Sequence, residues 1–349
     1  MPGALARLRV PLTTAPMEAR LVAEIPRGPG WQYEPKWDGF RCLAFRDGDE
    51  VALMSKSGKP LARYFPEVAA LLRDCGEDRF VVDGELILPL GDSLSFAALQ
   101  ARLHPAASRI ARLSRETPAK LMLFDCLQSG TKPLLDRSLD QRRAELEEFM
   151  AAVPPGVRLS PLTYDPDTPE DWLARSGGAL DGIVAKRRDE PYRPGERAMA
   201  KRKLRRTADC VLGGFRYDRA GNTVASLLLG LYDEAGLLHH VGFTSALSAA
   251  ERRALTPELE KLKGPSAFTG SAPGGASRWS NGRDTAWVPL RAERVVEVAY
   301  DQATGGRFRH GTTFLRWRPD KAPRQCTMDQ LAAELRPEQL EELLGIAPS

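Results

Sequence analysis

The stretch Glu34-Pro35-Lys36-Trp37-Asp38-Gly39-Phe40-Arg41 combines residue types that could carry nucleophilic chemistry. A lysine amine can attack phosphorus once it is free, yet an ordinary lysine has a pKa of about 10.4 and is mostly protonated at neutral pH. Neighbouring cations or a metal must therefore lower the pKa of a lysine that acts as a nucleophile. A triphosphate under attack also needs Lys, Arg and Mg²⁺ around it. Lys36 is a candidate nucleophile, although a K-x-D-G pattern alone arises easily by chance.

The same stretch and later ones supply the cations and carboxylates that such a site requires. They lie at the ends of expected strands or in turns and include Asp38, Glu85, Asp181, Lys186, Lys201 and Lys203. Each member alone has a simpler explanation, because Lys36 could be a surface lysine and Asp181-Gly182 an ordinary tight turn. The occurrence of all these stretches in one fixed order favours a catalytic site. A Walker-type phosphate loop is not indicated at Ser55–Lys59, because the earlier glycine is missing and Pro60 replaces Ser or Thr.

The composition is that of an ordinary soluble globular protein. The chain has 349 residues, which suits two domains with a core in each. The net charge of +4 says little about binding partners. Basic residues concentrate between Lys186 and Arg206, and such a run can be either a solvated face or a surface that binds a phosphate backbone. Five scattered cysteines argue against a disulfide framework, and four histidines without zinc-ligand spacing argue against a structural zinc. No signal peptide or membrane span is indicated, so we expect a cytoplasmic protein.

The first part of the chain mixes strands and helices without regular β-α-β alternation. Arg41–Phe45 and Val51–Ser55 are expected strands, joined by a hairpin turn at Asp47-Gly48. The apolar runs at Arg79–Leu88 and Ala119–Leu127 are short enough to be buried strands. This pattern predicts an α+β domain with mixed antiparallel sheets over residues 1–205, not a doubly wound sheet.

The character of the chain changes after Arg206. The strand-like segments there are Cys210–Phe215, Val224–Tyr232, Leu237–Phe243 and Val295–Tyr300, with a helix-like segment, Leu247–Lys263, between the third and the fourth. Several short strands with one inserted helix are typical of a small barrel such as an OB-fold. We therefore expect a C-terminal OB-fold β-barrel over residues 206–349, ending in a polar helix from Met328 to Leu344.

Six short motifs and one longer closing motif follow one another in a fixed order. They are KWDGFR (Lys36–Arg41), SKSGK (Ser55–Lys59), VVDGEL (Val81–Leu86), LFDCL (Leu123–Leu127), DGIVAK (Asp181–Lys186), KRK (Lys201–Lys203) and RFRHGTTFLRWRPDKAP (Arg307–Pro323). With this set the chain resembles ATP-dependent DNA ligases of the covalent nucleotidyltransferase superfamily over nearly its full length. The closing motif is the most specific and resembles that of the small bacterial ligases, DNA ligase C and the ligase domain of DNA ligase D. The resemblance implies a nucleotidyltransferase (adenylation) domain followed by an OB-fold domain that holds the closing motif.

The resemblance also implies a reaction, cofactors and site residues. Lys36 would take AMP from ATP and pass it to a 5′-phosphate at a DNA nick, and the 3′-hydroxyl would then attack the DNA-adenylate and release AMP. The cofactors would be ATP and Mg²⁺ (or Mn²⁺). The resemblance implies that Glu34 contacts the adenine amino group and that Phe124 stacks on adenine. Arg41 would contact the ribose or a phosphate, and Glu85 a ribose hydroxyl or a metal, while Asp181 would contact the metal. Lys56 would contact the nick phosphate, and the α-phosphate would be contacted by Lys186, Lys201 and Lys203.

The closing motif is expected to swing over ATP in the first step and to leave afterwards. The positions that match the family are Arg316, Arg318, Asp320 and Lys321, of which Asp320 and Lys321 would orient the pyrophosphate. The natural hinge is the stretch Lys203–Thr207.

Three positions depart from the family pattern. Asp181 replaces the usual glutamate and is about one methylene shorter, Lys56 replaces an arginine that could form a bidentate fork, and Met199 replaces an aromatic residue. These departures leave the rate and the metal geometry open, whereas the nucleophile is retained.

Other functions remain open from the sequence alone. An RNA ligase or an mRNA-capping guanylyltransferase shares K-x-D-G chemistry, and a catalytically silent DNA-end-binding protein could have kept the shape. The RWRPDK part of the closing motif disfavours capping, and the retained Lys36 with its cations disfavours the silent protein. The expected substrate is nicked double-stranded DNA, bound by charge and shape, in repair, recombination or replication. The resemblance suggests a primase-polymerase and Ku as partners, and we expect a monomer without membrane attachment.

Overall fold

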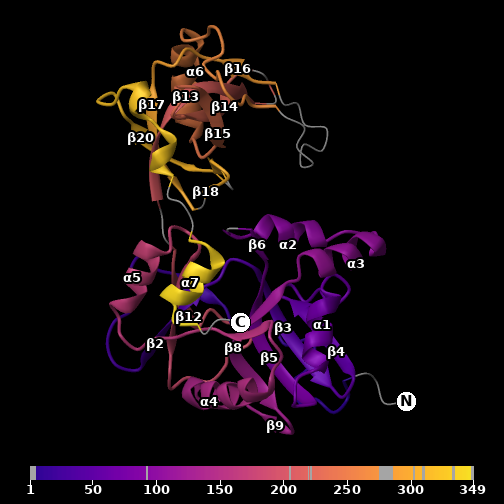
Figure 1. Ribbon diagram of the computed structural model, residues 1–349. Helices are drawn as coiled ribbons and strands as arrows, with labels where there is room; N and C mark the ends of the chain where they lie inside the picture. The colour runs from indigo at the N-terminus through magenta and orange to yellow at the C-terminus, as the bar shows by residue number, and fades with distance from the viewer. Residues whose placement is uncertain are drawn as a thin grey trace. The chain divides into compact units, whose positions relative to one another are not determined.

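The computed structural model describes residues 5–91, 93–203, 206–218, 220, 222–274, 286–301, 303–308, 311–331 and 335–346. The chain divides into two compact units, Met1–Lys203 with Glu334–Ser349 and Leu204–Ala333 (Figure 1). Residues 204–205, beside the predicted boundary and in the predicted hinge, and residues 309–310 of the closing motif lie outside the described residues.

A six-stranded sheet forms the larger part of the first unit. Its hydrogen-bonded order is β10-β8-β5-β3-β4, with β9 paired to β8. The strands are β3 (Phe40–Asp47), β4 (Glu50–Ser55), β5 (Arg79–Ile87), β8 (Lys120–Ser129), β9 (Lys132–Pro133) and β10 (Val157–Leu159). The predicted hairpin between β3 and β4 is confirmed. Its turn contains Gly48 at a φ of 65°, a conformation that glycine adopts without a side-chain clash.

The helices of the first unit pack on its sheets. They are α1 (Pro66–Arg73), α2 (Phe96–Arg102), α3 (Ala107–Glu116), α4 (Leu139–Phe149), the short η1 (Met150–Ala152) and α5 (Thr168–Arg175), with a small hairpin of β6 (Pro89–Leu90) and β7 (Ser93–Leu94) before α2. Helix α1 contacts β4, and α4 contacts β8. Phe65, Phe80 and Leu121 are fully buried in the core between them. Helix α4 starts where Ser138 accepts a hydrogen bond from the Gln141 amide in a capping box.

A second sheet brings three of the sequence motifs side by side. Its order is β1-β12-β11-β2, formed by β1 (Ala19–Leu21), β12 (Met199–Arg202), β11 (Gly182–Arg187) and β2 (Trp31–Lys36). Strand β11 pairs antiparallel with both β2 and β12. The end of β2 with Lys36, the DGIVAK strand and the KRK strand are therefore neighbours, although they are far apart in sequence.

The second unit is a six-stranded antiparallel sheet with one inserted helix. The order β15-β14-β13-β17-β20, with β16 on β13, is formed by β13 (Arg206–Tyr217), β14 (Val224–Tyr232), β15 (Leu238–Thr244), β16 (Val288–Pro289), β17 (Val295–Tyr300) and β20 (Thr313–Trp317). Helix α6 (Ala249–Glu260) follows β15, and the pair β18 (Ala303–Thr304) and β19 (Arg307–Phe308) precedes β20. A bridge between Thr244 and Thr312 joins the two edges at one point, but the described residues form no continuous closed barrel. The predicted α+β fold class is confirmed, and the second unit is consistent with an OB-fold.

The C-terminal helix differs from the prediction. We expected one helix over Met328–Leu344 within the OB domain, but that stretch holds a short helix, η3 (Met328–Gln330), in the second unit and α7 (Pro337–Leu343) in the first. Leu340 of α7 is buried, and the Glu341 carboxylate lies 3.6 Å from the side-chain nitrogens of both Lys120 and Arg158. Apolar burial and these ion pairs attach α7 to the first unit, whereas we had expected the C-terminal helix to belong to the OB-fold domain.

Candidate active site

A pocket of about 960 Å³ opens in the first unit beside the end of β2. Eight of the predicted site residues line it, namely Glu34, Lys36, Arg41, Lys56, Glu85, Phe124, Lys186 and Lys201. They come from β2, β3, β5, β8, β11 and β12 and from the turn after β4. A pocket of this size with convergent charged groups is what a nucleotide site requires.

The candidate nucleophile lies at the last residue of β2 and pairs with a carboxylate. Lys36 Nζ donates a hydrogen bond to Asp181 Oδ2, and Lys203 Nζ lies 3.1 Å from Asp181 Oδ1. The Asp181 amide donates to the Lys36 carbonyl at 3.0 Å, which fixes the two residues side by side. Gly182, which follows, has a φ of 151°, and a Cβ there would meet the Arg202 carbonyl oxygen at 2.2 Å. Glycine is therefore required for the close approach of β11 and β12 that brings Lys203 to Asp181.

A buried ion pair and an aromatic ring form another part of the pocket. Lys186 Nζ donates to Glu34 Oε2 at 2.7 Å, and Gln32 Nε2 donates to Glu34 Oε1 at 2.8 Å. Lys186 Nζ also lies 4.7 Å from the centroid of the Phe124 ring, and the Arg41 guanidinium lies 4.6 Å from it. Cations over an aromatic face are attracted by its quadrupole, so Lys186 and Arg41 hold this ring in place.

Arg41 is fixed by partners that the sequence analysis did not single out. Its Nε and Nη2 each donate to the Asp83 carboxylate at 2.6 Å, in bidentate geometry. The Tyr192 hydroxyl donates to the same carboxylate at 2.7 Å and accepts from the Met17 amide at 2.8 Å. Asp83 belongs to the VVDGEL motif, so its role as a site residue could have been predicted from the sequence. Tyr192 lies in no motif.

Two pocket residues have shifted pKa values. Burial raises the pKa of the Glu85 carboxyl to about 7, although Arg41 and Lys36 act in the opposite direction. Burial also lowers the pKa of Lys201, and the nearby charges of Lys36, Lys56 and Lys203 lower it further. A raised carboxyl pKa of this kind is common in functional sites.

Lys56 lies on the turn after β4 and pairs with a carboxylate on the facing segment. Its Nζ is 3.0 Å from Glu18 Oε2, and this hydrogen bond lowers the pKa of Glu18. Both residues line the pocket, and the Lys56 side chain is 60% exposed. Such an exposed pair is weak and easily exchanged for another anion.

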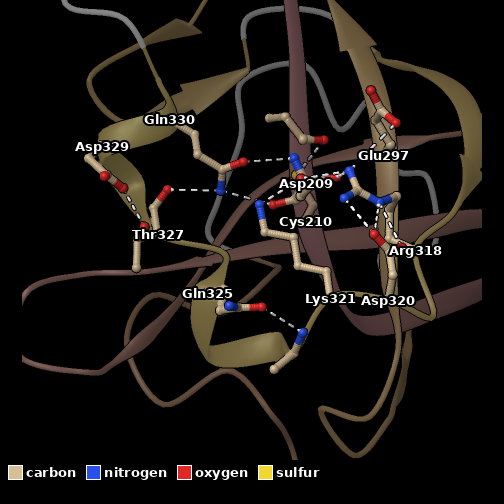
Figure 2. Close-up of polar contacts among 12 residues, drawn as sticks. Asp209, Cys210, Glu297, Arg318, Asp320, Lys321, Gln325, Thr327, Asp329 and Gln330 are labelled. Carbon is tan, nitrogen blue, oxygen red and sulfur yellow. Dashed lines mark hydrogen bonds and ion pairs between the residues drawn. The ribbon is translucent and has the colours of Figure 1, made fainter.

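The closing motif forms a charged cluster within the second unit (Figure 2). Arg318 donates from Nη1 to Asp209 Oδ1 at 2.9 Å and from Nη2 to Asp320 Oδ2 at 2.8 Å. Lys321 Nζ donates to Asp209 Oδ2 at 2.7 Å, and Arg316 Nε donates to Glu297 Oε2 at 2.6 Å. The hydrogen bond from Arg318 lowers the pKa of Asp320 to about 2. The four predicted residues are thus brought together, with Asp209 and Glu297 as partners that lay outside the motif.

The carboxylates of Asp181 and Glu85 could hold a metal ion only together with oxygens of a bound nucleotide. Among the described residues, no group of three or more His, Cys, Asp or Glu side chains is arranged to hold a metal ion. Mg²⁺ is commonly bound by one or two protein carboxylates together with substrate phosphates and water. The oxygen donors of Asp181 and Glu85 fit that type of site.

Comparisons with known proteins agree with the motifs. The model of the "ATP dependent DNA ligase domain" family matches residues 16–203, and that of the "ATP dependent DNA ligase C terminal region" matches residues 220–321. The chain is 47% identical to DNA ligase C2 of Mycolicibacterium smegmatis over 91% of its own length and 94% of the relative.

Two further relatives extend the comparison. The multifunctional non-homologous end joining DNA repair protein LigD of Mycobacterium tuberculosis is 30% identical over 86% of this chain and 37% of its own length. A solved Lig E DNA ligase has a similar fold, with a TM-score of 0.51 at 18% identity over 86% of this chain and 100% of that one. In the part of the chain that the structure describes, no helix has the length and apolarity needed to cross a membrane.

Proposed function

Because the chain belongs to the ATP-dependent DNA ligase family, we propose that it seals nicks in duplex DNA through an AMP adduct on Lys36. The observation that carries this proposal is the position of the Lys36 amine, which lines a nucleotide-sized pocket and is paired with Asp181. The same carboxylate contacts Lys203, so a second cation lies near the amine, where the phosphates would bind.

The reaction consists of three transfers at phosphorus. In the first, Lys36 Nζ attacks the α-phosphorus of ATP. A P–N bond forms, the bond to the leaving pyrophosphate breaks, and the amine loses a proton. In the second, an oxygen of the 5′-phosphate at the nick attacks the same phosphorus and frees the lysine. In the third, the 3′-hydroxyl attacks the 5′-phosphorus, closes the strand and releases AMP.

We assign the base to the pocket region around Phe124. The ring stacks on adenine, and Glu34 accepts from the adenine amino group. The resemblance implied that Lys186 contacts the α-phosphate, but we assign Lys186 to the adenine region instead, because its amine pairs with Glu34 and lies over Phe124. Lys201 and Lys203 remain the candidates for the α-phosphate, and Glu85 for a ribose hydroxyl.

Arg41 and Lys56 have different roles in this proposal. Both Arg41 bonds to Asp83 orient the guanidinium under Phe124, so Arg41 supports the ring and presents its remaining N–H groups to the ribose or phosphate. Lys56 is exposed, and its weak pair with Glu18 can be exchanged for the 5′-phosphate of the nick.

A divalent metal, Mg²⁺ or Mn²⁺, would be held by Asp181 and Glu85 together with phosphate oxygens. Its chemistry is to neutralise charge that develops on the phosphates. Asp181 already contacts Lys36 and Lys203, so this carboxylate links the amine, a phosphate-binding cation and the metal position.

We propose that the first unit is the adenylation domain and the second the OB-fold domain. The closing motif of the second would then meet the triphosphate, with Asp320 and Lys321 orienting the pyrophosphate. The similarity to an end-joining repair protein supports a role in DNA repair. It also supports Ku and a primase-polymerase as partners, to be tested by co-purification.

The intact mass of the protein, before and after ATP, GTP or pyrophosphate, tests the nucleophile. The proposal expects a gain of one AMP with ATP and divalent metal, reversal by pyrophosphate, and no adduct in Lys36→Ala. A GMP adduct would indicate a capping-type enzyme instead. Sealing of a nicked duplex by Lys36→Ala would show that the nucleophile is wrongly assigned.

A further inference from the structure

One carboxylate in the second unit, that of Asp209, holds two cations of the closing motif, Arg318 and Lys321. Asp209 Oδ2 accepts from Arg318 Nη1 at 3.1 Å and from Lys321 Nζ at 2.7 Å, so the two positive groups share one oxygen (Figure 2). Arg318 and Lys321 would repel each other without it. Two adjacent cations are also what a polyphosphate needs, because its charge is spread over several oxygens.

The sheet fixes the place of this carboxylate. Asp209 on β13 is paired with Glu297 on β17, and Glu297 is paired with Arg316 on β20. The Arg318 amide donates to the Val295 carbonyl at 2.9 Å, which ties the motif to β17 as well. Three neighbouring strands therefore place the acids and the motif at one level of the sheet.

The backbone of Asp209 is fixed a second time, by an amide side chain. The Asp209 amide donates to Gln330 Oε1 at 2.9 Å, and Gln330 Nε2 donates to the Asp209 carbonyl at 3.1 Å. This reciprocal pair uses the backbone and leaves the carboxylate for Arg318 and Lys321. A rigid backbone is what a carboxylate needs if it is to hold other side chains in a defined geometry.

Stability alone is a poor reason for a charge at this position. Asp209 is 8% exposed and lies between Ala208 and Cys210, both of which belong to the apolar core. Replacing a buried ion pair by apolar residues is often neutral or stabilising. The carboxylate therefore calls for an explanation in terms of what its partners do.

We propose that Asp209 is a positioning residue for the adenylation step, which holds Arg318 and Lys321 side by side for the triphosphate. The Nε and Nη2 groups of Arg318 donate hydrogen bonds to Asp320, and its Nη1 group donates to Asp209. Lys321 gives one of its three ammonium hydrogens to Asp209 in the bond described above. The inference rests on the proposed role of the closing motif in orienting the pyrophosphate.

The test separates the step that uses ATP from the step that does not. Single-turnover formation of the AMP adduct is followed over a range of ATP concentrations for wild type, Asp209→Asn and Asp209→Glu. Sealing of a pre-adenylated nick without ATP is measured on the same preparations. Asp233→Asn is the matched control, since Asp233 is another acid of this unit and pairs with His239 outside the cluster.

We expect Asp209→Asn to need roughly tenfold more ATP for half-maximal adenylation, because small misplacements of binding groups can cost up to about a hundredfold. Sealing of the pre-adenylated nick should stay within about twofold of wild type, since no triphosphate takes part. Asp209→Glu should retain more adenylation than Asp209→Asn, and Asp233→Asn should match wild type. Normal adenylation by Asp209→Asn would overturn the inference, and faster adenylation would show that Asp209 competes with ATP instead.

A double-mutant comparison shows whether Asp209 acts through Lys321. In a Lys321→Ala background, Asp209→Asn should lose most of its effect on adenylation; an undiminished effect contradicts the inference. If Lys321→Ala and Arg318→Ala adenylate normally, the proposed role of the closing motif fails instead. If Asp209→Asn does not fold, as judged by its circular dichroism and thermal unfolding, Asp209→Ser takes its place with the same expected outcome; a folded variant that loses pre-adenylated sealing contradicts the inference.

Discussion

Glu34 on β2 and Lys186 on β11 form an ion pair across the sheet, with Lys186 Nζ at 2.7 Å from Glu34 Oε2. The two residues lie diagonally on one face, since Lys186 is paired with Gln32 and Val184 with Glu34. The Lys186 side chain is only 4% exposed, and that of Glu34 only 3%. The structure thus places a charged pair inside the pocket at the point where we assign the adenine.

Breaking this pair should destabilise the protein more than removing both charges. Lys186→Met leaves the Glu34 carboxylate buried without its cation, at a cost of roughly 3–5 kcal/mol in the free energy of unfolding. Glu34→Gln combined with Lys186→Met should recover most of that loss. Chemical denaturation measures both effects. ATP recognition should not recover in the double variant, and full recovery of adenylation would contradict our assignment of these residues to the base.

Asp181 should be essential for adenylation, because its carboxylate contacts both the nucleophile Lys36 and Lys203. We expect Asp181→Asn to slow formation of the AMP adduct by about a hundredfold, a typical cost of losing one electrostatic contact in an active site. Asp181→Glu, which restores the family's usual residue, should be far less impaired. Asp171→Asn on the exposed face of α5 is the control. A rate near that of wild type in Asp181→Asn would refute this role.

Glu85 should make adenylation depend on pH near neutrality. Burial raises the pKa of Glu85 to about 7, and we assign the ionised form to the ribose hydroxyl or the metal. The adenylation rate should therefore rise between pH 6 and pH 8 as the carboxyl ionises. Glu85→Gln should be slow and should lack this rise. An unchanged profile in Glu85→Gln would assign the pH dependence to another group.

The same carboxyl should affect stability in the opposite direction. Its folded-state pKa of about 7 is above the ordinary 4.5, so the folded state binds more protons between these values. The stability it contributes is full below pH 4.5 and is lost as the pH rises through about 7. Glu85→Gln should thus be more stable than wild type at pH 8, by roughly 1–2 kcal/mol after allowing for the partial exposure of Glu85, and similar to it at pH 4. Denaturation curves at the two pH values test the sign.

Tyr192 should matter for stability although it lies in no motif. Tyr192→Phe removes the hydroxyl that contacts both Asp83 and the Met17 amide, and leaves these buried groups with one partner fewer. We expect a loss of about 2–3 kcal/mol in the free energy of unfolding. Tyr164→Phe is the matched control, because the Tyr164 side chain is 52% exposed. Equal stability of the two variants would show that the Tyr192 hydroxyl is not part of a stabilising network.

The residue types and their order were sufficient to predict the chemistry. KWDGFR, VVDGEL, DGIVAK and the closing motif specify a lysine, carboxylates and cations of the right kinds, and the apolar runs around them predict the strands that carry them. These signals are local, because a strand's apolar pattern and a motif's spacing are both properties of a few consecutive residues. The ligase family, the α+β fold class and the hairpin at Gly48 could all be predicted in this way.

Only the tertiary structure decided which of these groups meet. Lys186 is in the same motif as Asp181, yet the alternation of side chains along β11 and its register with β2 bring it to Glu34 and Phe124. Asp209 reaches Lys321 across 112 positions of sequence. Helix α7 packs on the first unit because its buried leucine and Glu341 find partners there. Strand pairing and core packing between distant segments set these contacts, and periodicity within one segment carries no information about them.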